Sequence, residues 1–170
     1  MATTPRDNVL DWLRDAHGME QQAESMLTAQ AERLENYPDL RARIQQHIEE
    51  TRWQQQQLEA CISRLGGSTS TVKDLTGKLM AFGQGIVGMT MTDEVVKGAL
   101  SGYVFENMEI ASYTILIAAA EAVGDTATRD TCAAILNQEV AMARWLLEHL
   151  GPVTETFLLR DQTPGVQAKR

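Results

Sequence analysis

Five glutamates fall at positions where the sequence pattern predicts a buried core. Four long segments repeat apolar residues at helical spacing, and each segment carries glutamate within its own apolar stripe. Ionised glutamate is almost never buried without a partner, so these positions are candidates for chemistry. The five residues are Glu20, Glu50, Glu106, Glu109 and Glu139.

The place of each glutamate along its helix predicts that the carboxylates meet. Glu20, Glu50, Glu106 and Glu139 each lie roughly 17–20 Å from the expected start of their helix, at ~1.5 Å per residue. Each helix is about twice that long, so all four residues are near mid-height, where antiparallel packing keeps them level. Glu109 follows Glu106 by one turn on the same face. We therefore expect five carboxylates in one layer of the core.

Clustered carboxylates of this kind cannot remain as bare ions inside a bundle. Either protonation or bound cations must compensate their charge. Two divalent ions bridged by carboxylates would do so, which predicts a dinuclear iron or manganese centre and a possible di-metal oxidoreductase. Further ligands or outer partners of the site are expected from four residues: His47, Gln54, His17 and Tyr113. The alternative is that some glutamates point outward or pair with Arg, Tyr or His of a neighbouring helix.

The elements that must position these residues are four helices, expected at residues 7–35, 39–65, 93–123 and 126–150. Pro38 ends the first segment and suits the first turn of the second. Gly66 and Gly67 stop the second segment, and Gly124 with Asp125 separates the last two. Gly151-Pro152 is expected to close the fourth helix, leaving a C-terminal tail at 152–170 with a short helix at 154–160.

The connection at residues 66–92 is too long for a tight turn, and we expect a short helix inside it. A long link lets the third helix start from the end where the second began, which is the one-crossover topology of ferritin-like four-helix bundles. The sequence predicts an all-α fold and a single domain spanning 1–170.

The charge balance limits the classes of partner, and the cysteine content bears on the cellular location. The 170 residues carry 15 basic and 23 acidic side chains, for a net charge of −8. This balance argues against a nucleic-acid partner and against docking on an anionic membrane. Two cysteines, no apolar leader and no spanning segment favour a cytoplasmic protein. The segment at 93–123 is apolar around much of its circumference, which predicts a homodimer that buries part of it or of the crossover.

Long stretches of the chain resemble the YciE/YciF-type ferritin-like stress proteins, and YciE more closely. The resemblance covers nearly the whole sequence and rests on five blocks: WLRDAHGMEQQAESML, ENYPDLRARIQQHIEET, VVKGALSGYVFENMEIASYT, AILNQE and FLLRDQTPGVQAKR. It implies a ferritin-like bundle, a dimer and a role in stress. The wider superfamily places metal-binding carboxylates on all four helices, and the five glutamates match that pattern.

The histidines depart from the superfamily pattern, which has Glu-x-x-His on the second and fourth helices. Trp53 and Met142 stand at those two histidine positions. His47, one turn before Glu50, is the available substitute. A site poor in nitrogen would favour harder ions or hold metal more weakly. The alternative function is therefore a non-catalytic bundle with a degenerate site that acts as a structural or partner-binding stress protein.

Overall fold

The computed structural model describes residues 4–69 and 91–169, which form four helices and no strand. They are α1 (Pro5–Arg33), α2 (Pro38–Arg64), α4 (Glu94–Ala122) and α5 (Thr126–Asp161). The predicted ferritin-like helical bundle is confirmed. The short helix expected in the long connection would fall on residues outside those described. No described helix has the length and apolar character needed to cross a membrane.

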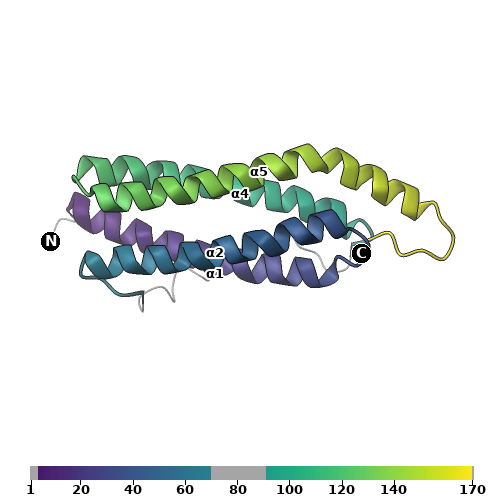
Figure 1. The fold of residues 1–170 in the computed structure, drawn as a ribbon, viewed down its shortest axis with the longest axis horizontal. Coiled ribbons are helices and arrows are strands. Elements are labelled where there is room, and N and C mark those ends of the chain that lie inside the picture. Colours follow the sequence, from purple (N-terminus) through teal and green to yellow (C-terminus); the bar gives the residue numbers. More distant parts are fainter. Residues whose placement is uncertain (1–3, 70–90, 170) are drawn as a thin grey trace.

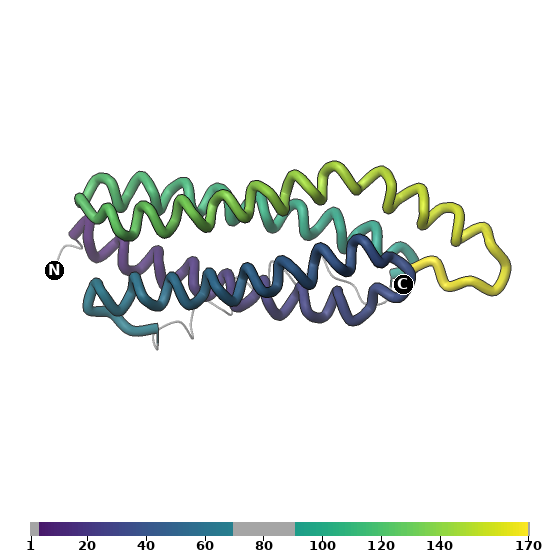
Figure 2. The backbone as a smooth tube through the Cα atoms, viewed as in Figure 1, coloured from purple at the N-terminus to yellow at the C-terminus, as the bar shows by residue number. Residues whose placement is uncertain are grey.

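The bundle consists of two antiparallel helix pairs, α1 with α2 and α4 with α5 (Figure 1). The pairs pack with α1 against α4 and α2 against α5. The chain trace in Figure 2 shows α2 and α4 running in the same direction, as a long crossover requires. Each of the four helices therefore contacts two neighbours and turns one face towards the common core.

Local signals in the sequence set the helix ends. The Thr4 and Asp7 side chains form a capping box at the start of α1. Gly66 and Gly124 follow α2 and α4 with φ of 79° and 72°, in the left-handed region that glycine adopts without strain. Asp125 then caps α5 by accepting a hydrogen bond from the Thr128 amide at 3.1 Å.

Buried apolar residues flank a polar middle layer on every helix. Each glutamate expected in the core has buried apolar residues before and after it on the same helix, so hydrophobic packing on both sides closes the layer from water. These flanking residues are Leu13 and Leu27, Ile44 and Leu58, Ala99 and Leu116, and Ile135 and Leu146.

The predicted end of the fourth helix at Gly151-Pro152 is wrong, because α5 continues through Pro152 to Asp161. Pro152 and Gly151 are both exposed, so water can satisfy the carbonyl that proline leaves without a donor. Val153 and Phe157 are buried and anchor the extension to the core. Packing has outweighed the helix-breaking signal.

The last residues also fold back onto the bundle. Beyond α5 the chain returns towards the turn between α1 and α2 (Figure 2). There Ala168 is buried and its carbonyl accepts a hydrogen bond from the buried Tyr37 hydroxyl. Arg160 donates to the Gln167 carbonyl at 3.1 Å. The tail is thus part of the folded structure.

Removing the Tyr37 hydroxyl should weaken this attachment. Tyr37→Phe keeps the ring but leaves the Ala168 carbonyl without its donor, so we expect the free energy of unfolding to fall by about 1 kcal/mol. Urea unfolding followed by circular dichroism measures this. Tyr103→Phe is the matched control, because the Tyr103 hydroxyl donates no hydrogen bond to a described residue. Equal stability of both variants and wild type would contradict the attachment.

Candidate metal centre

A compact group of acidic residues and one histidine lies in the middle layer. Ligand atoms of His47, Glu106, Glu109 and Glu139 all lie within 4.8 Å of one another, and all four residues are buried. They come from three helices: α2 supplies the imidazole, α4 two carboxyl groups one turn apart, and α5 the fourth. We call these four residues the Glu/His cluster.

Helix α1 contributes Glu20, which is also buried beside this cluster. Its Oε1 atom accepts a hydrogen bond from the buried Tyr113 hydroxyl of α4. Its Oε2 atom has no hydrogen-bond partner among the described residues. Tyr113 therefore fixes one oxygen of Glu20 and leaves the other open to a ligand.

His47 is the positive centre of the group. Its Nδ1 atom lies 2.7 Å from Oε2 of Glu50, and its Nε2 atom lies 3.2 Å from Glu106 and 3.3 Å from Glu139. Burial alone would lower the pKa of His47, but the surrounding carboxylates, Glu106 first, raise it well above its ordinary value. In the metal-free protein the imidazole is therefore doubly protonated and supplies one compensating charge.

Glu50 lies outside the Glu/His cluster, on its solvent side. Its side chain is 20% exposed, and three groups hold it: His47, Arg43 at 3.2 Å and Gln46 at 2.8 Å. Burial raises the pKa of Glu50, but His47 and Arg43 lower it by more, so the net shift is downward. Of the α2 residues that the sequence brought forward, His47 rather than Glu50 is the one that faces Glu106 and Glu139.

Gln54 contacts a residue of the Glu/His cluster, whereas His17 does not. Gln54 is fully buried, and its amide donates to Glu139 and, at 2.9 Å, to Gln138, while its own oxygen has no partner among the described residues. Gln54 therefore orients Glu139 from a position on α2 that is one turn beyond Glu50. His17 pairs instead with the exposed Glu59 at 3.0 Å, on the α1–α2 side of the bundle.

Burial is the largest influence on the pKa values of Glu20, Glu106 and Glu109, and it raises all three. The pKa of Glu106 reaches about 7, because His47 offsets part of the effect of burial. The pKa values of Glu20 and Glu109 lie well above their ordinary range, and neighbouring carboxylates, Glu139 and Glu20 respectively, raise them further. Without metal, the layer therefore avoids charge repulsion by holding protons.

The unpartnered oxygens decide whether these residues suit a metal. Both carboxyl oxygens of Glu109, one of Glu20 and the amide oxygen of Gln54 are buried without a hydrogen-bond partner among the described residues. Buried polar atoms of this kind normally have hydrogen-bond partners. A single divalent cation could bind several of these oxygens at once. An oxygen-rich set with one nitrogen fits iron or manganese, and Glu20, Glu106, Glu109, Glu139 and His47 are the residues that would hold it.

The sequence reasoning did not bring forward Arg43. It precedes His47 by one helical turn, which places both on one face of α2. Arg43, His47 and Glu50 thus lie on one face of α2 at successive turns. This spacing is the signal that could have predicted that Arg43 and His47 both pair with Glu50.

The raised pKa values predict that the metal-free protein loses stability as pH rises. A carboxyl group or a histidine with a raised pKa in the folded state stabilises it fully below the unfolded pKa and loses that effect as pH passes the folded value. For Glu106 the shift from 4.5 to about 7 corresponds to on the order of 3 kcal/mol. We expect the melting temperature in chelator to fall steadily from pH 5 to pH 8.

Scanning calorimetry in chelator measures this slope. Glu109→Gln should flatten it and raise the melting temperature at pH 8, because the amide cannot ionise. Glu155→Gln, at an exposed position, should leave the slope unchanged. A melting temperature that stays flat or rises over this range would contradict the assigned protonation.

Known proteins share both the sequence and the fold. Residues 4–159 match the profile of the family described as "Domain of unknown function (DUF892)". A solved structure from Xanthomonas campestris pv. campestris is 39% identical, with 94% of this chain and 100% of that chain covered and a TM-score of 0.80. YcfI from Rhodopseudomonas palustris is 29% identical, with 85% and 93% covered and a TM-score of 0.66.

The Escherichia coli stress protein YciF shares the fold at 20% identity, with 88% of this chain and 96% of that chain covered and a TM-score of 0.70. These matches support the YciF-type resemblance, while a closer relation to YciE stays a prediction. Because the family profile covers residues 4–159, nearly the whole bundle, this chain belongs to the DUF892 family.

Proposed function

We propose that this chain is a ferritin-like stress protein that binds two divalent metal ions, iron or manganese, in its middle layer. The observation that carries the proposal is the set of buried, unpartnered oxygens of Glu109 and Glu20 beside the Glu/His cluster. Four carboxyl groups from three helices would share the ions, with His47 as the nitrogen ligand from the fourth.

A bound pair of such metals would supply redox chemistry, in which the electrons lost when Fe(II) is oxidised would reduce O₂ or peroxide. The chain's own residues prepare the layer for this. Tyr113 holds Glu20, Gln54 holds Glu139, and Glu50 fixes the ring of His47. The apolar residues on both sides exclude bulk water, which strengthens each of these electrostatic contacts. A role in stress and a cytoplasmic location belong to the same proposal.

One observation favours a second function. His47 already forms ion pairs with Glu106 and Glu139, so a protonated imidazole occupies the place between two expected ligands. In this alternative the layer is a degenerate site balanced by His47 and by protons. The chain is then a non-catalytic bundle with a structural or partner-binding role.

Metal titration separates the two functions. If the layer is a metal site, Fe(II) without oxygen, or Mn(II), should bind near two ions per chain. At 100 times the dissociation constant, binding stabilises the fold by about 2.7 kcal/mol, or about 5–10 °C in melting temperature. Glu109→Gln should lower the affinity by at least about tenfold, while Glu155→Gln should not. Isothermal titration calorimetry with calorimetric melting measures both effects, and no heat and no shift in wild type would contradict the metal site.

The contact between Glu50 and Nδ1 of His47 predicts that Glu50 positions the histidine and does not itself bind metal. If it positions His47 through Nδ1, Glu50→Gln should weaken metal binding about 10–100-fold and leave the number of bound ions unchanged. If Glu50 is itself a ligand, as the sequence predicted, the stoichiometry should fall. Glu49→Gln, at the adjacent exposed position paired with Arg52, is the control. Equilibrium dialysis with elemental analysis gives the affinity and the stoichiometry together.

A further inference from the structure

The two cysteines of the chain lie on two helices that pack against each other. Cys61 is on α2 and Cys132 is on α5, and both are free thiols in the core, 4% and 0% exposed. Neither belongs to the Glu/His cluster. Because α2 and α5 come from different antiparallel pairs, a bond between the two sulfur atoms would join the two halves of the bundle.

A contact in the middle layer fixes the register of α2 against α5. The Gln54 amide donates to the Glu139 carboxyl group, so these two residues face each other. The helices are antiparallel, so a step of seven residues forward from Gln54 along α2 reaches the same level as a step of seven residues back from Glu139 along α5. The residues at those two positions are the cysteines.

The cysteines also lie on the faces that meet. Seven residues make almost two full turns, so each cysteine is on the same side of its helix as Gln54 or Glu139, whose side chains touch. The fully buried Leu58 and Ile135 fill the level between the two pairs. The thiols therefore face each other at a level roughly 10 Å from the metal layer, at ~1.5 Å per residue.

Electrostatic interactions support this proximity and distinguish the two thiols. Burial, and after it the neighbouring Cys61, raises the pKa of Cys132 to about 12, so the Cys132 thiol keeps its proton. Hydrogen bonds to Asp125 and, less strongly, to Cys61 raise the pKa of Arg64. A positive charge beside a cysteine favours the thiolate, which is the form that attacks an oxidant. The same guanidinium opposes a bound cation at this level.

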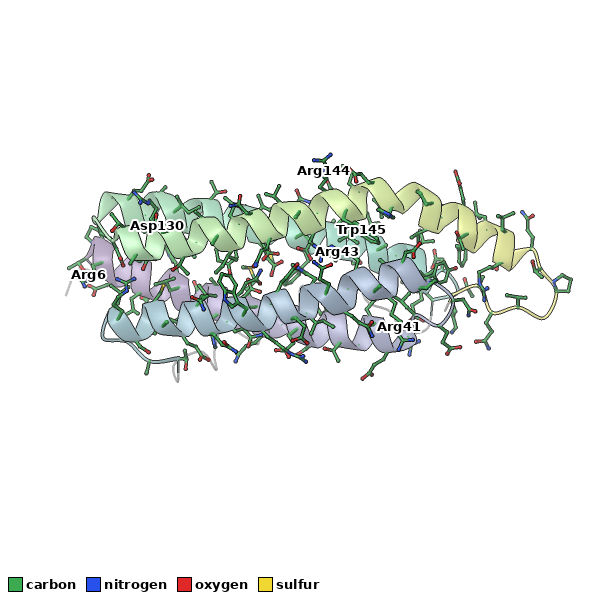
Figure 3. The ribbon with its side chains drawn as sticks, viewed as in Figure 1. Arg6, Arg41, Arg43, Asp130, Arg144 and Trp145 are labelled. Carbon is green, nitrogen blue, oxygen red and sulfur yellow. The ribbon has the colours of Figure 1, made fainter. Side chains whose placement is uncertain are left out.

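The pair lies close to one end of the bundle. Arg64, one turn beyond Cys61, has a side chain that is 41% exposed. Asp130, two residues before Cys132, is labelled in Figure 3 towards the end of the bundle where Arg6 lies. Both cysteines are within two turns of a helix end, where local opening costs the least free energy. Such an opening admits a molecule as small as hydrogen peroxide.

We infer that Cys61 and Cys132 form a reversible disulfide when hydrogen peroxide reaches them. The Cys61 sulfur attacks one peroxide oxygen, the O–O bond breaks, and the other oxygen leaves as water with the thiol proton. The Cys132 sulfur then attacks the sulfur of this sulfenic acid, the S–O bond breaks, and a second water leaves with the Cys132 proton. Each sulfur gives up one electron, and the peroxide takes up both. The reaction requires no metal.

Peroxide treatment in chelator tests the disulfide apart from the proposed metal centre. Reduced wild type in a small excess of hydrogen peroxide should lose both thiols, measured by maleimide labelling of the denatured chain, and its intact mass should fall by two hydrogens. A non-reducing tryptic digest should contain residues 53–64 linked to residues 130–144. Dithiothreitol should restore both thiols. The oxidised chain should melt about 5–15 °C above the reduced chain, because the cross-link restricts the unfolded state.

Single substitutions test the order of the steps. Cys132→Ser should stop at the sulfenic acid of Cys61, which dimedone traps, whereas Cys61→Ser should keep its remaining thiol. Arg64→Gln should slow the loss of thiols several-fold. Arg144→Gln is the matched control, because the Arg144 side chain points away from the bundle in Figure 3 and pairs with Glu148. Circular dichroism checks that each variant keeps its helices.

Two free thiols in peroxide-treated wild type would overturn the proposal, as would a disulfide that joins two chains. Trapped sulfenic acid in Cys61→Ser but not in Cys132→Ser would reverse the assigned order. If Arg64 only holds the helix ends together, Arg64→Gln should open the bundle and speed the oxidation, which would contradict its assigned role. Because every sample contains chelator, failure here and failure of the proposed metal centre are separate results.

Discussion

The structure depends on how four helices bury acidic side chains in one layer without leaving bare charge. Glu20, Glu106, Glu109 and Glu139 would repel one another if all four were ionised, and burial makes that repulsion stronger than in water. In the metal-free chain, the raised pKa values of Glu20, Glu106 and Glu109 favour their protonated forms, and these protons and the imidazolium of His47 reduce the repulsion. The apolar residues on both sides hold this layer in place but do not compensate its charge. The metal-free fold therefore carries a cost that a bound cation would remove.

Helix α4 differs from the other helices in where it carries its charge. Its inner face carries the two glutamates, and its outer face carries apolar and small residues. An ordinary surface helix keeps its charges in solvent and only its apolar stripe in the core, whereas α4 also buries two glutamates among its apolar core residues. The proposed metal centre would account for the inner charge. The arrangement also explains why periodicity alone gave a segment that looked apolar around much of its circumference.

The helices and the level of the carboxylates were predictable, because helical period and a fixed rise per residue determine both. The direction in which each side chain points was harder to predict from the sequence. The spacing of three residues between His47 and Glu50 allowed either one to face the core, and the pairing of Glu50 with Arg43 decides it in the structure. The stop expected at Gly151-Pro152 failed for a related reason, since burial of Val153 and Phe157 is a tertiary effect that local propensity does not contain.

Anomalous scattering at the manganese edge, from crystals grown with Mn(II), tests the central claim most directly. The account predicts density within bonding distance of the Glu109 carboxyl group, with further ligand atoms from Glu20, Glu106, Glu139 and His47, and with Glu50 still bound to the far side of the imidazole. A layer without anomalous density, in which His47 keeps its ion pairs to Glu106 and Glu139, would contradict the metal site and leave a bundle balanced by protons.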